Sequence, residues 1–363
     1  MAYAWSSRIG QTSQVPIQKI AADNSVPMTG FVVTDLGGAT RATGVVRSAK
    51  KILMDGAKTM ARSQTYAWAI LEEQISGASA GVSVDPAGKD AGMAAFVEAV
   101  LGRVTARELS LDPAKGVSSE DLRLLDEADS RSKIGQTART NGTLNEELLA
   151  AGAFVSAAQV HGPLEGRRVI LEGTSSATAS FVAAAASHGA VVVGIATANG
   201  ALLNPNGFDL EELLGQLLES GPALGANLGT EAPASTLFEA DSDLVFCGSK
   251  LGLIDHEIAS RLSCKALVPI GPAPVTAKGL AVATSRGITV LPDFVSASGP
   301  LFADHPEEAA TAEQVLRTAN ESILLSVGEL ADHPEGHYLG ACYAAESFLR
   351  TWQEELPFGR PLA

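Results

Sequence analysis

Residues 164–214 read LEGRRVILEGTSSATASFVAAAASHGAVVVGIATANGALLNPNGFDLEELL, and this stretch decides the fold. Arg168–Glu172 is a short apolar run that ends at Gly173, and Ala190–Ala196 is a second run without polar alternation. Such runs are typical of strands buried on both faces of a sheet. The small residues of Ala177–His188 predict a helix between them. The stretch therefore predicts a strand–turn–helix–strand unit of the dinucleotide-binding type, about 30 residues long.

The turn inside this unit departs from the usual phosphate-binding pattern. A dinucleotide site uses G-x-G-x-x-G, followed by an acidic residue at the end of the second strand. Only the first glycine is present here, and Thr197 stands where the acid is expected. Serine and threonine at a helix N-terminus bind anions in some proteins but commonly serve only as caps. If a dinucleotide binds, the candidate residues are Gly173, Thr174, Ser175, Ser176, Thr178 and Thr197.

Length and composition narrow the class of protein. The chain has 363 residues, of which 46% are hydrophobic, enough for two domains with sizeable cores. A net charge of −15 argues against nucleic acid and anionic membranes as partners. The cysteines Cys247, Cys264 and Cys342 are far apart, and the first residues lack an apolar signal region, so we expect a cytoplasmic protein. The six histidines show no helical metal-binding pair, and no metal site is expected.

The remaining elements alternate between strands and helices. Residues 1–25 are expected to form an irregular arm, and Thr43–Leu71, with apolar residues at helical spacing, one long helix or two. Thr143 and Glu146 form a capping box that begins a helix. Further strands are expected at 29–34, 109–113, 243–247, 266–270 and 288–291, and further helices at 91–104, 311–330 and 335–355. This alternation predicts a parallel, doubly wound sheet.

Five segments, in this order and spacing, resemble the glutamate/leucine/phenylalanine/valine dehydrogenase family. They are LGGATR (36–41), SGASAGVSVDP (76–86), LEGRRV (164–169), NPNGFD (204–209) and RGITVLPDFVSASG (286–299). The resemblance implies an α/β protein of two domains with a cleft between them. Residues 1–135, with 330–363 returning, would form the substrate-type domain, and 140–329 the Rossmann-like domain with a doubly wound parallel sheet. It also implies NAD(P)-dependent oxidative deamination of an amino acid, and a homo-oligomer.

The active-site residues that this resemblance implies are largely replaced. Ser79 stands where the family has its catalytic lysine, and Ala67 follows Tyr66 where a second lysine binds the substrate carboxylate. Two asparagines of the family correspond to Pro272 and Ala297. Serine and alanine supply neither a general base nor a cation for the carboxylate. Losing one such group typically slows a reaction roughly a hundred- to a thousandfold.

Several residues remain as candidates for a site. Asp112 lies at the family's catalytic aspartate, with Pro113 as the alternative alignment, and Lys115 lies close enough to replace a lost lysine. Arg41, after a Gly-Gly turn, and Tyr66 are candidates for substrate binding. Each has a plainer interpretation, as a solvated or ion-paired surface group, and Cys247 as a buried thiol. The candidate catalytic residues are Asp112, Lys115 and Ser79.

Three functional hypotheses follow from this pattern. The first is a repurposed member that lacks ordinary oxidative deamination and binds an amino-acid- or keto-acid-like molecule in the cleft, with or without NAD(P). The second is a non-catalytic subunit or regulatory binding protein, assembled with an active paralogue. The third is an active NAD(P)-dependent dehydrogenase with an altered substrate. Whether the chain is an enzyme, and whether NAD(P) binds, therefore stay open at this point.

Overall fold

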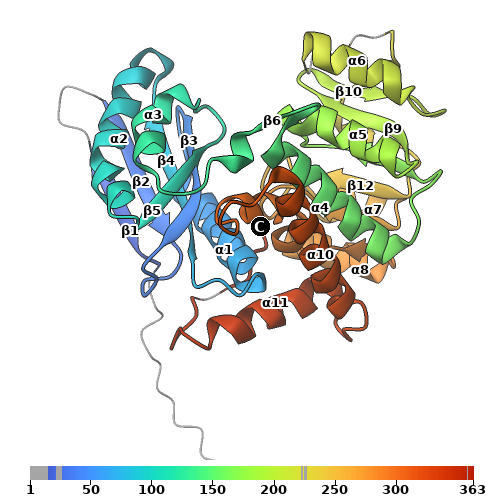
Figure 1. Cartoon of the computed structure of the whole chain (residues 1–363). Helices are drawn as coiled ribbons and strands as arrows, with labels where there is room; N and C mark the ends of the chain where they lie inside the picture. Colours follow the sequence, from blue (N-terminus) through green and yellow to red (C-terminus); the bar gives the residue numbers. More distant parts are fainter. Residues whose placement is uncertain (1–14, 22–26, 222–223, 225–226, 358) are drawn as a thin grey trace, which may run out of the picture.

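The computed structural model describes residues 15–21, 27–221, 224, 227–357 and 359–363. It is a two-domain α/β structure, as the sequence predicted, with one sheet in each domain. Figure 1 shows the N-terminal sheet and the C-terminal sheet on opposite sides of a central group of helices. A short hairpin of β6 (Ala138–Arg139) and β7 (Gly142–Thr143) lies in the segment that joins them.

The N-terminal sheet has five strands in the order β1-β2-β4-β3-β5. The pairs β1–β2 and β2–β4 are antiparallel, whereas β3 pairs in parallel with β4 and β5. One face packs on α2 and α3, and the other face packs on α1. The elements are β1 (Ile17–Ala21), β2 (Met28–Thr34), β3 (Ala42–Ala49), α1 (Met54–Ile70), β4 (Ser76–Val84), α2 (Lys89–Thr105), β5 (Leu109–Pro113) and α3 (Arg123–Ala128).

Two expectations for this domain were wrong. Residues 17–21, expected in an irregular arm, form the edge strand β1, while 1–14 and 22–26 lie outside the described residues. Residues 43–71 are not one continuous helical region, because Ala42–Ala49 is the strand β3. Within β3, Gly44 lies so close to β4 that an added Cβ would be 1.7 Å from Ala78 O. Burial between two parallel neighbours explains why this segment is a strand despite its apolar spacing.

The C-terminal sheet has seven strands in the order β11-β10-β9-β8-β12-β13-β14. The strand–turn–helix–strand unit predicted from the sequence is confirmed as β8, α5 and β9. The five strands from β9 to β14 are parallel, and β10 and β11 extend one edge in antiparallel pairing. The elements are α4 (Leu144–His161), β8 (Arg168–Leu171), α5 (Thr178–Ser187), β9 (Val191–Thr197), β10 (Gly200–Leu203), α6 (Leu210–Ser220), β11 (Thr230–Ala232), β12 (Leu244–Cys247), α7 (His256–Arg261), β13 (Ala266–Pro269), α8 (Ala277–Ser285) and β14 (Thr289–Val290).

Strand order reverses beside β8, since the chain continues to β9 on one side and later returns to β12 on the other. In open parallel sheets, ligands bind in the crevice at the carboxyl ends of the strands where this reversal occurs. The crevice between β8 and β12 is therefore the place to look for a dinucleotide.

The last helices lie between the two domains. Helix α9 (Asp293–Ser296) and helix α11 (Gly336–Leu349) pack on α1, and α10 (Ala312–Leu330) packs on α4. Figure 1 shows α11 passing beneath both α1 and α10. Tyr66 of α1 donates a hydrogen bond to Glu346 of α11 at 3.1 Å, which Arg360 also binds at 2.7 Å. Helix α11 ends at Leu349, earlier than the 355 expected from its apolar spacing.

The capping box predicted at Thr143 begins helix α4. Thr143 Oγ1 accepts from Glu146 N at 3.3 Å, and the Glu146 carboxylate accepts from Thr143 N at 2.8 Å. Replacing Thr143 by alanine is expected to lower the free energy of unfolding by about 1 kcal/mol, because the part-buried N–H of Glu146 loses its acceptor. Urea denaturation would measure the loss. The control is Thr105→Ala, whose exposed hydroxyl only bonds Leu101 O, and which should change stability by less than about 0.5 kcal/mol.

Candidate functional site

A cavity of about 270 Å³ lies between the two domains. The N-terminal domain contributes β3, α1, the end of β5 and β4, and the C-terminal domain contributes α4, the loop after β13 and α9. The lining residues are Gly44, Val45, Met60, Ser63, Gln64, Ala67, Ala78, Ala114, Leu149, Ile270, Gly271, Pro272, Asp293, Phe294, Ala297 and Leu301. Three of them, Ala67, Pro272 and Ala297, are positions where the resemblance implied functional side chains. None of the candidate catalytic and substrate-binding residues lines this cavity; these are Ser79, Asp112, Lys115, Arg41 and Tyr66.

Asp293 supplies the one ionisable side chain of this wall. Its exposed fraction is 2%, and its Oδ2 accepts hydrogen bonds from Ala273 N at 2.8 Å and from Ser63 Oγ. The other oxygen, Oδ1, accepts no hydrogen bond from any described group. Burial raises the pKa of Asp293 to about 6, although the N–H of Ala273 and the hydroxyl of Ser63 act in the opposite direction.

Sequence reasoning missed Asp293 as a functional residue. It appeared only as part of the Pro292-Asp293 pair beside the lost asparagine. The signal was a single acidic residue inside the apolar run ITVLPDFV, at 288–295. A carboxylate at that place is either exposed at the end of a strand or buried in a functional site. Only the packing of α9 against α1 distinguishes these two possibilities.

Ser79, at the position of the family's catalytic lysine, lies next to the cavity but not in its wall. It is in the centre of β4, fully buried, and its Oγ has no hydrogen-bond partner among the described residues. Its register partner on β3 is Val45, which lines the cavity. Paired residues of neighbouring strands point to the same face, so Ser79 lies on the cavity side of the sheet.

Asp112 is engaged in an ion-pair network that joins the two domains. Arg131, whose side chain is 8% exposed, bonds both Asp112 oxygens, at 2.7 and 3.0 Å. Arg131 also binds Asp129 at 2.9 Å and Asp304 at 3.2 Å. Both oxygens of Asp112 are therefore engaged by the guanidinium of Arg131. Lys115 is exposed, and its backbone carbonyl accepts from Ser48 N at 3.0 Å.

The two candidates for substrate binding lie outside the cavity wall. Arg41 bonds the ring of His305 across the domain boundary. The pKa of His305 is lowered to about 4 by desolvation and by the charges of Arg41 and Arg131, so the ring is neutral at pH 7. Tyr66 is buried and its hydroxyl faces Glu346 on α11.

The turn after β8 is stabilised by its own side chains. Gly173 has φ +80°, and a Cβ there would lie 2.4 Å from Ser249 N, so only glycine fits. Ser175 has φ +48° and carries a side chain where the second glycine would stand. Thr178 Oγ1 is 2.7 Å from Thr174 Oγ1 and donates to Ser175 O at 2.7 Å. Ser176 is exposed, and Thr197 is half-buried at the end of β9.

A buried carboxylate occupies the crevice beside this turn. Glu172, 6% exposed, follows β8 and accepts hydrogen bonds from the backbone N–H groups of Gly248 at 2.9 Å and Ser249 at 3.3 Å. These N–H groups lie at the end of β12, where an anion would otherwise find donors. The neighbouring thiol of Cys247 is fully buried, and burial raises its pKa, so it is not a reactive thiolate.

The residues of the crevice do not fit a bound dinucleotide. Ser175 and Thr178 replace the glycines that allow close approach of the pyrophosphate. The carboxylate of Glu172 lies beside the turn and already occupies the N–H groups of Gly248 and Ser249. Thr197 offers no carboxylate to the ribose hydroxyls.

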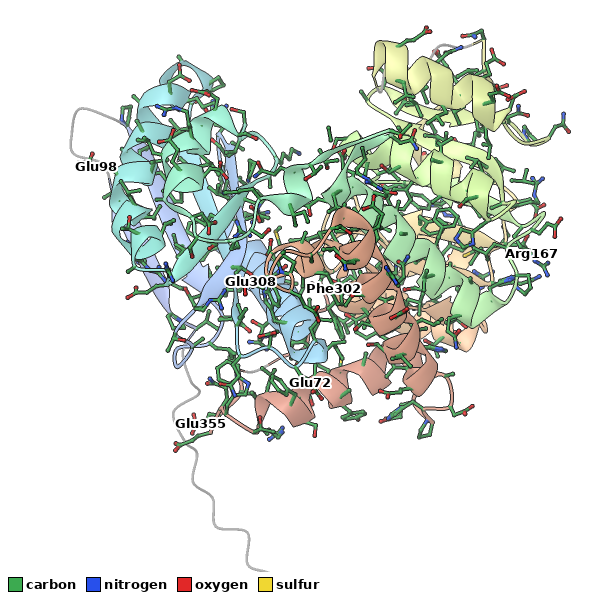
Figure 2. All side chains as sticks on the ribbon, in the orientation of Figure 1. Glu72, Glu98, Arg167, Phe302, Glu308 and Glu355 are labelled. Carbon is green, nitrogen blue, oxygen red and sulfur yellow. The ribbon has the colours of Figure 1, made fainter. Side chains whose placement is uncertain are left out.

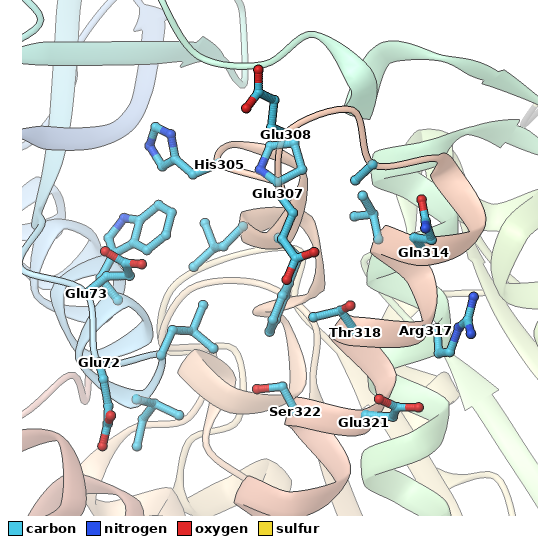
Figure 3. Close-up of a pocket in the computed structure, with 18 of the residues that line it drawn as sticks. Glu72, Glu73, His305, Glu307, Glu308, Gln314, Arg317, Thr318, Glu321 and Ser322 are labelled. Carbon is cyan, nitrogen blue, oxygen red and sulfur yellow. The ribbon is translucent and has the colours of Figure 1, made fainter.

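A larger cavity of about 680 Å³ opens between the end of α1 and the segment before α10. Glu72 and Glu73 lie on one side, and Glu307 and Glu308 on the other (Figure 3). Figure 2 locates Glu72, Phe302 and Glu308 at the junction of the two domains. The lining carries five glutamates against one arginine, Arg317, so its field repels phosphates and carboxylates.

The described residues contain no group of three or more His, Cys, Asp or Glu side chains arranged to hold a metal ion. None of the helices in these ranges is both long and apolar enough to cross a membrane.

Comparison with known proteins gives both sequence and structural relatives. Residues 148–322 match the family model described as Glutamate/Leucine/Phenylalanine/Valine dehydrogenase. An NAD-specific glutamate dehydrogenase of Staphylococcus aureus is 30% identical over 137 residues, which are 38% of this chain and 33% of that protein. A glutamate dehydrogenase of Aeropyrum pernix is 25% identical over 172 residues, 46% of this chain and 41% of that protein. The chain thus matches a third to two fifths of the length of these relatives.

Solved structures extend the likeness to nearly the whole chain. A hetero-hexameric glutamate dehydrogenase from Thermus thermophilus in a leucine-bound form has a TM-score of 0.77 at 19% identity, covering 94% of this chain and 89% of that one. An L-tryptophan dehydrogenase from Nostoc punctiforme has a TM-score of 0.62 at 14% identity, covering 93% and 95%. At these identities the likeness shows the fold. The family match over residues 148–322 therefore makes this segment similar to the glutamate/leucine/phenylalanine/valine dehydrogenase family, and the solved structures show that the fold of these enzymes extends over nearly the whole chain.

Proposed function

We propose that this chain is a repurposed member of the family, which lacks ordinary NAD(P)-dependent oxidative deamination and binds a small molecule related to an amino acid in the interdomain cavity. One observation carries the proposal. Among the residues that line the cavity there is no lysine, arginine or histidine, and the one ionisable group is the buried carboxylate of Asp293.

This wall cannot support the parent reaction. Oxidative deamination needs a cation that holds the substrate carboxylate and a base near neutral pKa that serves the reacting carbon. A carboxylate ligand would instead meet the charge of Asp293 in a site of low dielectric constant. The crevice beside Glu172 is a second obstacle. Hydride transfer requires a bound nicotinamide, and the residues of this crevice do not fit a dinucleotide.

A non-catalytic subunit is the second candidate, and one comparison favours it. The Thermus thermophilus relative is a hetero-hexamer and was solved with leucine bound. A chain of this fold without the catalytic side chains would suit a regulatory or structural role beside an active paralogue. Co-purification of the tagged chain with such a paralogue supports this version, whereas a homo-oligomer supports the first. In both versions we place the protein in the cytoplasm.

An active dehydrogenase with an altered substrate is the third candidate. It needs Lys115 or Arg41 to take the lost roles, but Arg41 bonds His305 and Lys115 is solvent-exposed. A Lys115→Ala variant would change turnover only in this third version.

The decisive experiment tests the cofactor and the reaction together. The purified chain, titrated with NADH and NADPH by calorimetry, is expected to show no saturable binding up to millimolar concentration and no turnover with a panel of amino and keto acids. The reason is the pair of side chains at Ser175 and Thr178 with the carboxylate of Glu172. Robust turnover of a common amino acid with either cofactor would overturn the proposal.

A matched variant identifies the cause of the expected result. Ser175→Gly combined with Thr178→Gly restores the two missing glycines without touching the interdomain cavity. Dinucleotide binding by this variant, absent from the wild type, would assign the loss to the turn. If the variant also fails, the Glu172→Gln change tests the crevice charge next.

A further inference from the structure

The interdomain cavity combines one buried charge with an otherwise apolar wall. Met60, Ala67, Leu149, Phe294 and Leu301 contribute hydrocarbon surface. Gln64 and Ser63 are the polar side chains beside Asp293. Such a wall suits a ligand with a hydrocarbon body and a single polar end. The volume of about 270 Å³ falls just below the roughly 300 to 1,000 Å³ of drug-sized sites, so the ligand is small.

The hydrogen bonds of Asp293 leave part of its carboxylate without a partner. Both donors, Ala273 N and Ser63 Oγ, go to Oδ2. The N–H groups of Asp293 and Phe294 help to stabilise the negative charge, yet Oδ1 accepts no hydrogen bond from a described residue. A carboxylate offers about four acceptor positions and is unfavourable when buried without a counter-charge. A ligand with a positively charged N–H donor would supply both the missing hydrogen bond to Oδ1 and the missing counter-charge.

We propose that the ligand of the interdomain cavity is a small amine without a carboxylate group, whose ammonium binds Asp293 and whose hydrocarbon part fills the apolar wall. This inference rests on the proposed function, since it names the class of molecule that the repurposed site takes. An α-amino acid fits less well because its carboxylate has no cation in the wall. A keto acid has no donor for Asp293 at all. An alcohol can donate one hydrogen bond but leaves the buried charge without a counter-charge.

The titratable groups around Asp293 do not change charge in the pH range in which Asp293 does. The titratable side chains that face it are Tyr338 and Cys342 on α11 and Cys247 on β12. Tyr66 of α1 packs its ring on Phe294, with centroids 5.4 Å apart. Burial raises the pKa of each of these four groups, so all stay neutral between pH 5 and 8. A change of ligand affinity in that range would therefore report Asp293.

The test uses the full chain and three sets of matched ligands. Each set has one hydrocarbon skeleton carrying an amine, an alcohol, a carboxylate, or an amine with a carboxylate. The amines are 3-methylbutylamine, 2-phenylethylamine and n-propylamine. By calorimetry at pH 8, at least one amine is expected to bind about ten- to a hundredfold more tightly than its alcohol, as for a charge-assisted hydrogen bond. Its affinity should fall roughly tenfold at pH 5, where Asp293 is protonated.

Variants give the second readout. Asp293→Asn keeps the size of the side chain and removes the charge, so it should weaken the amine by about tenfold or more and leave the alcohol within about threefold. The control is Asp255→Asn, at the exposed N-terminus of α7, which should change neither ligand. Thermal melting confirms that both variants are folded.

The outcomes separate this inference from the function on which it rests. The amine class is overturned if no amine binds at millimolar concentration, if a carboxylate or alcohol binds as tightly as its amine, or if Asp293→Asn keeps the wild-type amine affinity. Each of these results leaves the absence of oxidative deamination untouched. Turnover of the amino-acid members with NAD(P) would instead overturn the proposed function.

Discussion

Replacing Arg131 by methionine is expected to lower the free energy of unfolding by about 3 to 5 kcal/mol at pH 8, because one partner of a buried ion network is removed. Arg131 joins Asp112 and Asp129 of the N-terminal domain to Asp304 beyond the C-terminal sheet. Methionine keeps a side chain similar to the aliphatic part of arginine but leaves three carboxylates close together without a counter-charge. Urea denaturation, followed by fluorescence and by circular dichroism, measures the loss and tests whether both domains respond.

The deficit should shrink as the pH falls. Burial already raises the pKa of Asp304 to about 6 while Arg131 holds it down, and Arg131 keeps the pKa of Asp129 below its usual range. Without Arg131 both values rise above the roughly 3.9 of an unfolded aspartate. A carboxylate whose pKa is raised in the folded state destabilises the fold fully at pH values above that pKa. The destabilisation disappears as the pH falls and the carboxylate becomes protonated. The variant should therefore approach the wild type between pH 7 and pH 4.

The matched control is Arg123→Met, on the neighbouring helix α3. Arg123 pairs with Glu127 at 2.6 Å, but both side chains are more than half exposed, and such exposed pairs contribute little to stability. Arg131→Lys should recover only part of the loss, since an ammonium cannot bond three carboxylates in the geometry of a guanidinium. Equal effects of Arg131→Met and Arg123→Met would contradict a structural role of the network.

Some elements of the fold could be predicted from local sequence patterns alone. The apolar runs on both sides of Gly173 determine β8 and β9, and the capping box at Thr143 determines the start of α4. Strand β3 could not be recognised, because Val45 and Val46 also fit a helical spacing. The segment is a strand because it pairs with β4 and β5. The register pairs Ala42↔Ser76 and Ala42↔Leu109 join residues that are 34 and 67 positions apart in the sequence.

The candidate site was harder to predict, for a physical reason. Replacements such as Ser79, Ala67 and Ala297 can be identified from a resemblance, because each is a residue in a known place. What a replaced site contains instead depends on contacts between distant segments. Ser63 and Asp293 are 230 residues apart, and Arg131 and Asp304 are 173 residues apart. The sequence offers Asp112 as a candidate base, but it does not reveal that Arg131 binds both of its carboxylate oxygens.

Asp293→Asn is expected to make the protein more stable at pH 8 by about 2 to 3 kcal/mol, while weakening the proposed amine site. The folded-state pKa of Asp293 is raised to about 6, roughly two units above an unfolded aspartate, and one unit corresponds to about 1.4 kcal/mol. At pH 8 the folded state carries this buried charge. As the pH falls through 6 the carboxylate protonates and the penalty fades, and near pH 4 it is gone.

Asparagine fits the same hydrogen bonds. Its amide oxygen can accept from Ala273 N and Ser63 Oγ as Oδ2 does, and its NH₂ takes the place of the unpartnered Oδ1. The gain in stability should therefore be seen at pH 8 and be absent at pH 4, in urea denaturation or thermal melting. Asp255→Asn, at an exposed helix cap where asparagine serves as well as aspartate, should show neither. A residue whose removal stabilises the fold is retained for a reason other than stability, and in this cavity that reason is a ligand that carries the opposite charge. If Asp293→Asn is instead less stable at pH 8, the carboxylate is a structural group, and the argument for a cationic ligand loses its main support.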